Sequence, residues 1–176
     1  PARAAAPAGR RLAAGWQGKP TVPGPQQSAA WGHVFDVERR QRLLKMRDGE
    51  FWVPATDVAW SPDGQRLLSA DVNGLAEVWE RATDHKVASS QMQTAVIKAL
   101  AWSPDGQRVA SGSEDGTVRV WDPIHAEELL KLDLPKAFAT QLEWSRDGRR
   151  LAAATAGGAI YIWGAANGKD FIHGGA

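Results

Sequence analysis

The feature that most constrains this fold is a 42-residue internal repeat. Two tryptophans recur at that spacing, the first as Trp60, Trp102 and Trp144 and the second as Trp79, Trp121 and Trp163. Each copy of the first is followed by a turn sequence, Ser-Pro-Asp-Gly at 61–64 and 103–106 and Ser-Arg-Asp-Gly at 145–148. Proline presets φ in such a turn, and glycine supplies the positive φ at its end. A repeat of this length indicates a supersecondary unit that buries its apolar face against a neighbouring unit.

The best-preserved copy, residues 101–122, has the pattern of three short strands joined by two tight turns. Val109, Val118 and Val120 suit a pleated, half-buried surface. Glu114-Asp115-Gly116 is a hairpin signal of the Asp-Gly kind. We therefore expect each unit to be a four-stranded antiparallel sheet, with strands a to d in chain order. No segment sustains a helical period over three turns, so no helix is expected.

A fourth, degenerate copy lies upstream. Residues 9–14 match residues 148–153 at every position, and Phe35-Asp36 takes the place of Trp121-Asp122, although Ala5 stands at the first tryptophan position. The sequence therefore predicts one repeat domain, 1–176, with units at about 1–46, 55–90, 97–132 and 138–173. The first unit alone carries a large insertion, the loop 15–29, which is rich in proline and glycine and is expected to be irregular.

The segment 111–122, Ser-Gly-Ser-Glu-Asp-Gly-Thr-Val-Arg-Val-Trp-Asp, resembles the signature of the WD-repeat β-propeller family. The resemblance implies an all-β fold, a β-propeller of four four-stranded antiparallel blades that is partial or open. Closed rings of this kind usually have about six to eight blades. The chain is therefore expected to be a fragment of a larger propeller, whose other blades come from flanking sequence, a partner or self-association.

The hydrogen-bonded tetrad of that family is only partly matched. Its remnant would be Ser111 or Ser113 with Asp115 and Trp121, and its histidine is missing. The blades are therefore expected to depend more on apolar packing than on a polar network.

Composition argues against several functional classes. Lys and Arg number 21 and Asp and Glu 20, which gives no global electrostatic case for nucleic acid or a membrane surface. The shared repeat position of Arg10-Arg11 and Arg149-Arg150 predicts a solvated edge. The chain has no cysteine, which fits a cytoplasmic location and excludes a zinc ribbon. Its four histidines share no metal-ligand spacing, and the recurring Ser and Asp are turn residues. We expect no catalytic residue, metal or cofactor.

Three tryptophans, Trp16, Trp31 and Trp52, lie outside the repeated tryptophan positions, and Phe51 lies beside Trp52. In an antiparallel blade the b–c loops and the d–a connections share one face, so the insertion 15–29 and the extension at 47–55 fall together. One interpretation is that these aromatics bind a protein partner or a parent domain. The other is that they pack the long loop onto its own blade.

The function that the sequence favours is a non-catalytic protein–protein interaction scaffold within a larger multidomain protein. One alternative is the accessory propeller of a peptidase or TolB-like protein, whose repeats also favour Trp-Ser-Pro-Asp-Gly. Another is an RNA- or ribosome-associated propeller, against which the balanced charge argues. The Trp121-Asp122 ending and the Asp115-Gly116-Thr117 turn favour the WD-repeat interpretation.

Overall fold

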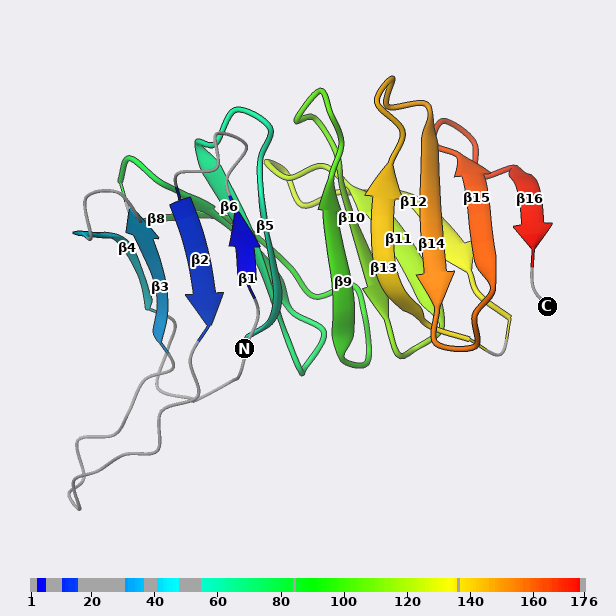
Figure 1. Cartoon of the computed structure of the whole chain (residues 1–176), viewed down its shortest axis with the longest axis horizontal. Coiled ribbons are helices and arrows are strands. Elements are labelled where there is room, and N and C mark those ends of the chain that lie inside the picture. The colour runs from blue at the N-terminus through cyan, green and yellow to red at the C-terminus, as the bar shows by residue number, and fades with distance from the viewer. Residues whose placement is uncertain are drawn as a thin grey trace, which may run out of the picture.

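The computed structural model describes residues 3–5, 11–15, 31–36, 41–47, 55–83, 85–135 and 137–174, with side chains in 55–83, 85–135 and 137–169. These residues form four antiparallel sheets of four strands each, and every sheet is built from consecutive strands (Figure 1). The expectation of an all-β fold of antiparallel sheets is confirmed. In the described part of the chain no helix is long and apolar enough to cross a membrane.

The strands of the first two sheets are β1 (Arg3–Ala5), β2 (Arg11–Gly15), β3 (Trp31–Asp36), β4 (Gln41–Arg47), β5 (Ala55–Trp60), β6 (Arg66–Asp71), β7 (Ala76–Glu80) and β8 (His85–Ser90). Those of the third and fourth are β9 (Ile97–Trp102), β10 (Val109–Ser113), β11 (Thr117–Trp121), β12 (Glu128–Asp133), β13 (Ala139–Trp144), β14 (Arg150–Thr155), β15 (Ile160–Gly164) and β16 (Asp170–Gly174).

The sequence repeat becomes a repeat of strand register. In each sheet an aliphatic residue of the second strand pairs with an aromatic residue of the third. The pairs are Leu12 with Phe35, Leu67 with Trp79, Val109 with Trp121 and Leu151 with Trp163. The degenerate copy therefore keeps the register of the others even though its aromatic residue is phenylalanine.

The turns form as their sequences predict. Gly64, Gly106 and Gly148 have φ of 66°, 69° and 66°, a region that glycine enters without steric cost. Each of these glycine amides donates a hydrogen bond to the serine carbonyl that opens its turn, at 2.8, 2.9 and 2.8 Å. These turns fix the link between the first and second strands of their sheets.

The sheets stack face to face in chain order, and the described strands form an open row rather than a closed ring (Figure 1). The first strands, β1, β5, β9 and β13, lie next to one another along the row. The first sheet stands at one end and the sheet β13–β16 at the other. Each end sheet therefore has only one neighbouring sheet within the described part of the chain.

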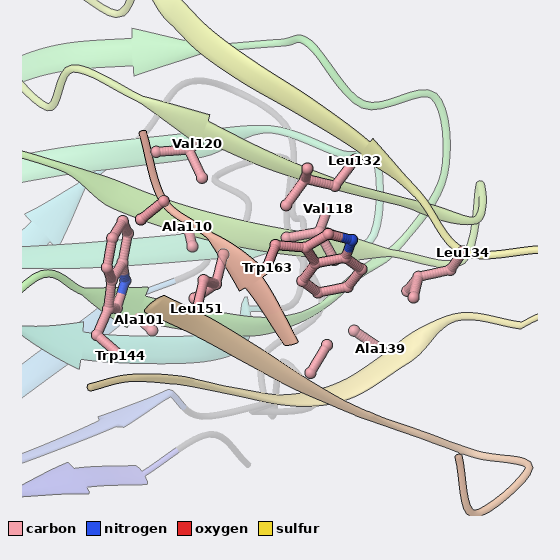
Figure 2. Packing of buried hydrophobic residues seen from close by; sticks show 12 residues of the cluster. Ala101, Ala110, Val118, Val120, Leu132, Leu134, Ala139, Trp144, Leu151 and Trp163 are labelled. Carbon is pink, nitrogen blue, oxygen red and sulfur yellow. The ribbon is translucent and has the colours of Figure 1, made fainter. Parts of the chain in front are cut away.

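The core lies between the sheets. From the third sheet, Ala110, Val118 and Val120 pack against the fourth, and we call such a surface the Val face of its sheet (Figure 2). The surface of the fourth sheet that contacts this Val face consists of Trp144, Leu151, Ala153 and Trp163, and we call such a surface the Trp face of its sheet. Between the second and third sheets, Ala70 and Val78 meet Trp102, Val109 and Trp121 in the same way. Small residues on one face thus leave room for tryptophans on the next.

Candidate interaction surface

The loops of the stacked sheets fall on two opposite faces because successive strands are antiparallel (Figure 1). The turn face carries the turns at 61–64, 103–106 and 145–148 and the loops between the third and fourth strands of each sheet. The connection face carries the hairpin loops between the second and third strands. It also carries the segments 91–96 and 134–138, which join one sheet to the next.

The connection 91–96 is hydrogen-bonded to the hairpin loops on both sides of it. Gln93 is only 3% exposed, and its Nε2 donates to the carbonyls of Ser111 and Thr117 at 3.1 and 3.3 Å. On the other side, Gln91 Nε2 donates to the carbonyl of Asn73 at 2.8 Å. These bonds tie two sheets together at their rim, which makes this part of the connection face a fixed surface.

A glycine allows the hairpin loop of the second sheet to lie very close to the connection 91–96. A Cβ added at Gly74, whose φ is +83°, would lie 2.3 Å from the carbonyl oxygen of Gln93, so the hairpin could not come this near with any other residue. In the next hairpin, Asp115 Oδ2 accepts the amide of Thr94 at 3.0 Å. Burial acts to raise the pKa of Asp115, but the Thr117 hydroxyl and the amides of Thr94 and Thr117 lower it overall. Asp115 is therefore an anion that anchors the connection.

The residues of the predicted tetrad remnant lie in two separate pairs. Trp121 Nε1 donates to Ser111 Oγ at 3.4 Å inside the sheet. Nearer the rim, Ser113 Oγ accepts the amide of Asp115 at 3.2 Å and donates to the carbonyl of Ala95 at 3.0 Å. The second sheet repeats only the inner pair, with Trp79 Nε1 donating to Ser69 Oγ at 3.0 Å. What remains of the polar network is local, and most of the contact between sheets is apolar.

The predicted partner-binding aromatics cannot be placed as side chains. Trp16, Phe51 and Trp52 lie outside the described residues. Trp31 begins β3, where its backbone pairs with Arg47 of β4, and its side chain is outside the described set. The interpretation that the segments 16–30 and 48–54 lie on the connection face therefore stays a prediction from strand parity.

Arg108 holds two sheets together on the turn face, and sequence reasoning missed it. Its guanidinium lies 4.7 Å from the Trp144 ring centre in the next sheet. Nη2 donates to the carbonyl of Gly148 at 2.9 Å and Nη1 to that of Ala165 at 3.3 Å. A signal was present, since Arg66 and Arg150 recur at the same spacing. The exposed Arg150 agrees with the predicted solvated edge, but Arg108 contacts the next sheet.

Asp57 makes a second contact between sheets. Its Oδ2 accepts the amide of Leu100 in β9 at 2.8 Å, and its Oδ1 accepts the amide of Val58 at 2.9 Å. Burial raises the pKa of this carboxyl, and the two amide hydrogen bonds only partly offset the rise. Ala99 and Gln141 occupy the equivalent positions, so the repeat contained no signal for this bond.

The recurring serine–aspartate pairs of the turns are structural. Ser61 Oγ donates to Asp63 Oδ1 at 2.5 Å and accepts the amide of Arg66 at 2.8 Å, and Ser103 repeats the arrangement. The hydrogen bond from Ser61 lowers the pKa of Asp63. Both hydroxyls are almost fully buried, so neither is presented to a substrate. Within 55–83, 85–135 and 137–169, no group of His, Asp and Glu side chains is placed to hold a metal ion.

Two segments of the chain, 43–80 and 86–122, match the family model of the WD domain, G-beta repeat. These two segments therefore have the sequence of WD repeats. The resemblance drawn from residues 111–122 is thereby confirmed. No curated protein sequence matches the chain.

Each matched WD repeat is out of phase with the sheets. The first begins within β4 and ends with β7, and the second begins within β8 and extends just beyond β11. One WD repeat therefore supplies the last strand of one sheet and the first three strands of the next. The segment between these strands is the connection, so 91–96 belongs to the interior of a WD repeat.

Proposed function

We propose that this chain is a non-catalytic protein–protein interaction module of a larger protein, and that its partner contacts the connection face beside the first sheet. The observation that carries the proposal is the pair of WD repeats, because WD repeats generally mediate protein–protein interaction. The fold alone would not fix a function, since one scaffold can host many. The choice of face therefore needs its own argument.

Rigidity and loop length favour the connection face. The segment 91–96 is bonded to the hairpins of two sheets, and the β12–β13 connection is tied to the β10–β11 hairpin by the amide of Leu134, which donates to the carbonyl of Gly116 at 2.8 Å. Binding residues tend to lie on loops that a rigid scaffold positions. By strand parity we expect the segment 16–30, which contains Trp16, and the connection 48–54, which contains Phe51 and Trp52, to lie on this face.

Aromatic side chains are suited to such a role. Tryptophan is enriched among the interface residues that lose the most binding energy on truncation. Trp16, Trp31, Phe51 and Trp52 are excluded from the repeated core positions, which the tryptophans of the 42-residue repeat already occupy. The net charge of the chain is only +1, which gives no global electrostatic case for a nucleic-acid partner.

The test uses Trp16→Ala and Trp52→Ala in the full-length protein, with Ile124→Ala as the control. Ile124 is an exposed apolar residue, 41% accessible, in the β11–β12 loop of the turn face. The partner is first identified by crosslinking and affinity purification, and each variant is then titrated calorimetrically. We expect each tryptophan variant to weaken binding more than about fivefold, which corresponds to about 1 kcal/mol. The thermal midpoint of each tryptophan variant should stay unchanged, and the control Ile124→Ala should bind with wild-type affinity.

Two outcomes would count against the proposal. Wild-type affinity in both tryptophan variants, together with a lower thermal midpoint, would show that these residues only anchor the loop. Loss of binding in Ile124→Ala alone would move the partner to the turn face.

A further inference from the structure

The chain contains two asparagines, and a glycine follows each of them. The pairs are Asn73-Gly74, in the loop between β6 and β7, and Asn167-Gly168, in the loop between β15 and β16. An asparagine before glycine is prone to lose its side-chain amide without a catalyst, because glycine has no Cβ to hinder attack by its own nitrogen. The two pairs have the same residues in the same order, so any difference in their reactivity comes from their surroundings.

The reaction converts asparagine to an acid in two steps. The glycine amide nitrogen loses its proton to solvent and bonds to the asparagine Cγ, while the Cγ–Nδ2 bond breaks and the leaving nitrogen takes a proton from solvent and departs as ammonia. Water then opens the cyclic imide. Hydrolysis at the side-chain carbonyl gives aspartate, and hydrolysis at the main-chain carbonyl gives isoaspartate. The first step therefore needs a glycine amide whose proton is not already in a hydrogen bond.

At Asn167 both reacting groups are held by hydrogen bonds. The Gly168 amide donates to the carbonyl of Gly164 at 2.8 Å, so its proton is engaged. Asn167 Oδ1 accepts the amide of Lys169 at 3.1 Å, which fixes the orientation of the side chain. The bond from Gly168 must break before the nitrogen attacks, so we expect Asn167 to react slowly.

The hairpin at Asn73 lacks this protection. Gly116, at the repeat position of Gly74, donates its amide to the carbonyl of Ser113 at 3.1 Å. Among the described residues the Gly74 amide finds no such acceptor, and the exposed side chain of Asn73 makes no hydrogen bond to any of them. The nitrogen next to Asn73 is therefore not restrained in the way that the nitrogen next to Asn167 is.

Isoaspartate at this position would disturb the contact with the connection 91–96. The carbonyl of Asn73 accepts Gln91 Nε2 at 2.8 Å. Isoaspartate carries the main chain through Cβ and Cγ, which turns this carbonyl into a free carboxylate and lengthens the hairpin loop. The loop has no room to spare, since a Cβ added at Gly74 would lie 2.3 Å from the carbonyl oxygen of Gln93. The longer loop cannot keep this close approach.

We propose that Asn73 is a site of spontaneous deamidation in the native protein, that Asn167 is spared, and that isoaspartate at Asn73 loosens the connection 91–96. The observation that carries the proposal is the contrast between the two glycine amides. The modified hairpin belongs to the connection face, but the proposal does not depend on what binds there.

Peptide mapping by mass spectrometry tests the first part on full-length protein aged in mildly alkaline buffer, native or unfolded in urea. We expect native Asn73 to deamidate about fivefold faster than Asn167, which corresponds to about 1 kcal/mol for the hydrogen bond that protects Gly168. Unfolding removes both environments, so the two rates should then become similar. Equal rates in native protein, a faster reaction at Asn167, or no reaction at native Asn73 would overturn the proposal.

Hydrogen exchange of fresh and aged protein tests the second part. Asn73→Gln is the protected variant, because glutamine keeps the amide but closes the larger ring far more slowly, and Asn167→Gln is the matched control. Ageing should speed amide exchange in 91–96 about fivefold in wild type and in Asn167→Gln, and leave Asn73→Gln unchanged. Unaltered exchange in 91–96 of wild-type protein shown to contain isoaspartate at position 73 would refute the loosening.

Discussion

Replacing Arg108 with alanine should separate the third and fourth sheets on the turn face. The guanidinium makes a 2.9 Å hydrogen bond to the carbonyl of Gly148 and lies 4.7 Å from the Trp144 ring centre. Its ion pair with Asp105, at 3.5 Å, is partly exposed and contributes little. The side chain of Arg108 is 24% exposed, so water can replace only part of what is lost.

The expected loss follows from these contacts. A hydrogen bond from a charged donor contributes about 1.5–3 kcal/mol, and we take the lower end because the site is partly solvated. A stacked guanidinium adds about 0.5–1 kcal/mol. Arg108→Ala should therefore lower the free energy of unfolding by about 2 kcal/mol. Arg150→Ala removes the same residue from the same repeat position, but its side chain is exposed, so its effect should stay within about 0.5 kcal/mol.

Urea unfolding followed by tryptophan fluorescence measures both variants. Arg108→Lys adds a second comparison, since lysine keeps the charge and loses the planar fork that contacts two carbonyls. We expect Arg108→Lys to recover only part of the lost stability. Equal effects of Arg108→Ala and Arg150→Ala would refute the reasoning, because the clamp would then contribute no more than a solvated side chain.

Two further predictions concern other contacts between sheets. Gly112→Ala would place a Cβ 2.7 Å from Ala139 Cβ in the next sheet, so it should lower the free energy of unfolding in urea by about 1–3 kcal/mol. Gly157→Ala, whose nearest neighbour is 4.0 Å away, should lower it by less than about 1 kcal/mol. Equal losses would contradict the close approach at Gly112. Asp57 has a native pKa above 3.8, so native protein binds more protons than unfolded protein just above that pH, and wild type loses stability there as pH rises. Asparagine does not titrate, so the stability of Asp57→Asn relative to wild type should increase from about pH 3 to about pH 7; a decrease would show that the carboxyl is not destabilised by burial.

Much of the fold could be predicted from the sequence because the repeat constrains it at many positions at once. Paired tryptophans, turn glycines and alternating valines all indicate the same antiparallel sheet. The register of Leu12 with Phe35 was also implied by residues 9–14, although the tryptophans of that copy are lost. Local preference and global packing agree at these positions, which is when sequence reasoning succeeds.

The contacts between sheets were harder to predict, because they depend on which residue lies opposite and not on the unit itself. Arg108 and Arg150 have the same local sequence position, and only the next sheet makes one of them a clamp. Asp57 is unique to its copy, so periodicity could not indicate its hydrogen bond to Leu100. The candidate site on the connection face was predicted from insertions and strand parity, and its four aromatic residues remain a prediction.

Hydrogen–deuterium exchange of the full-length protein, with and without its partner, tests the central claim most directly. If the partner contacts the connection face beside the first sheet, binding should slow exchange in 16–30 and 48–54. Exchange in the turns at 103–106 and 145–148 should not change. Protection confined to those turns, with none at 16–30 or 48–54, would contradict the account.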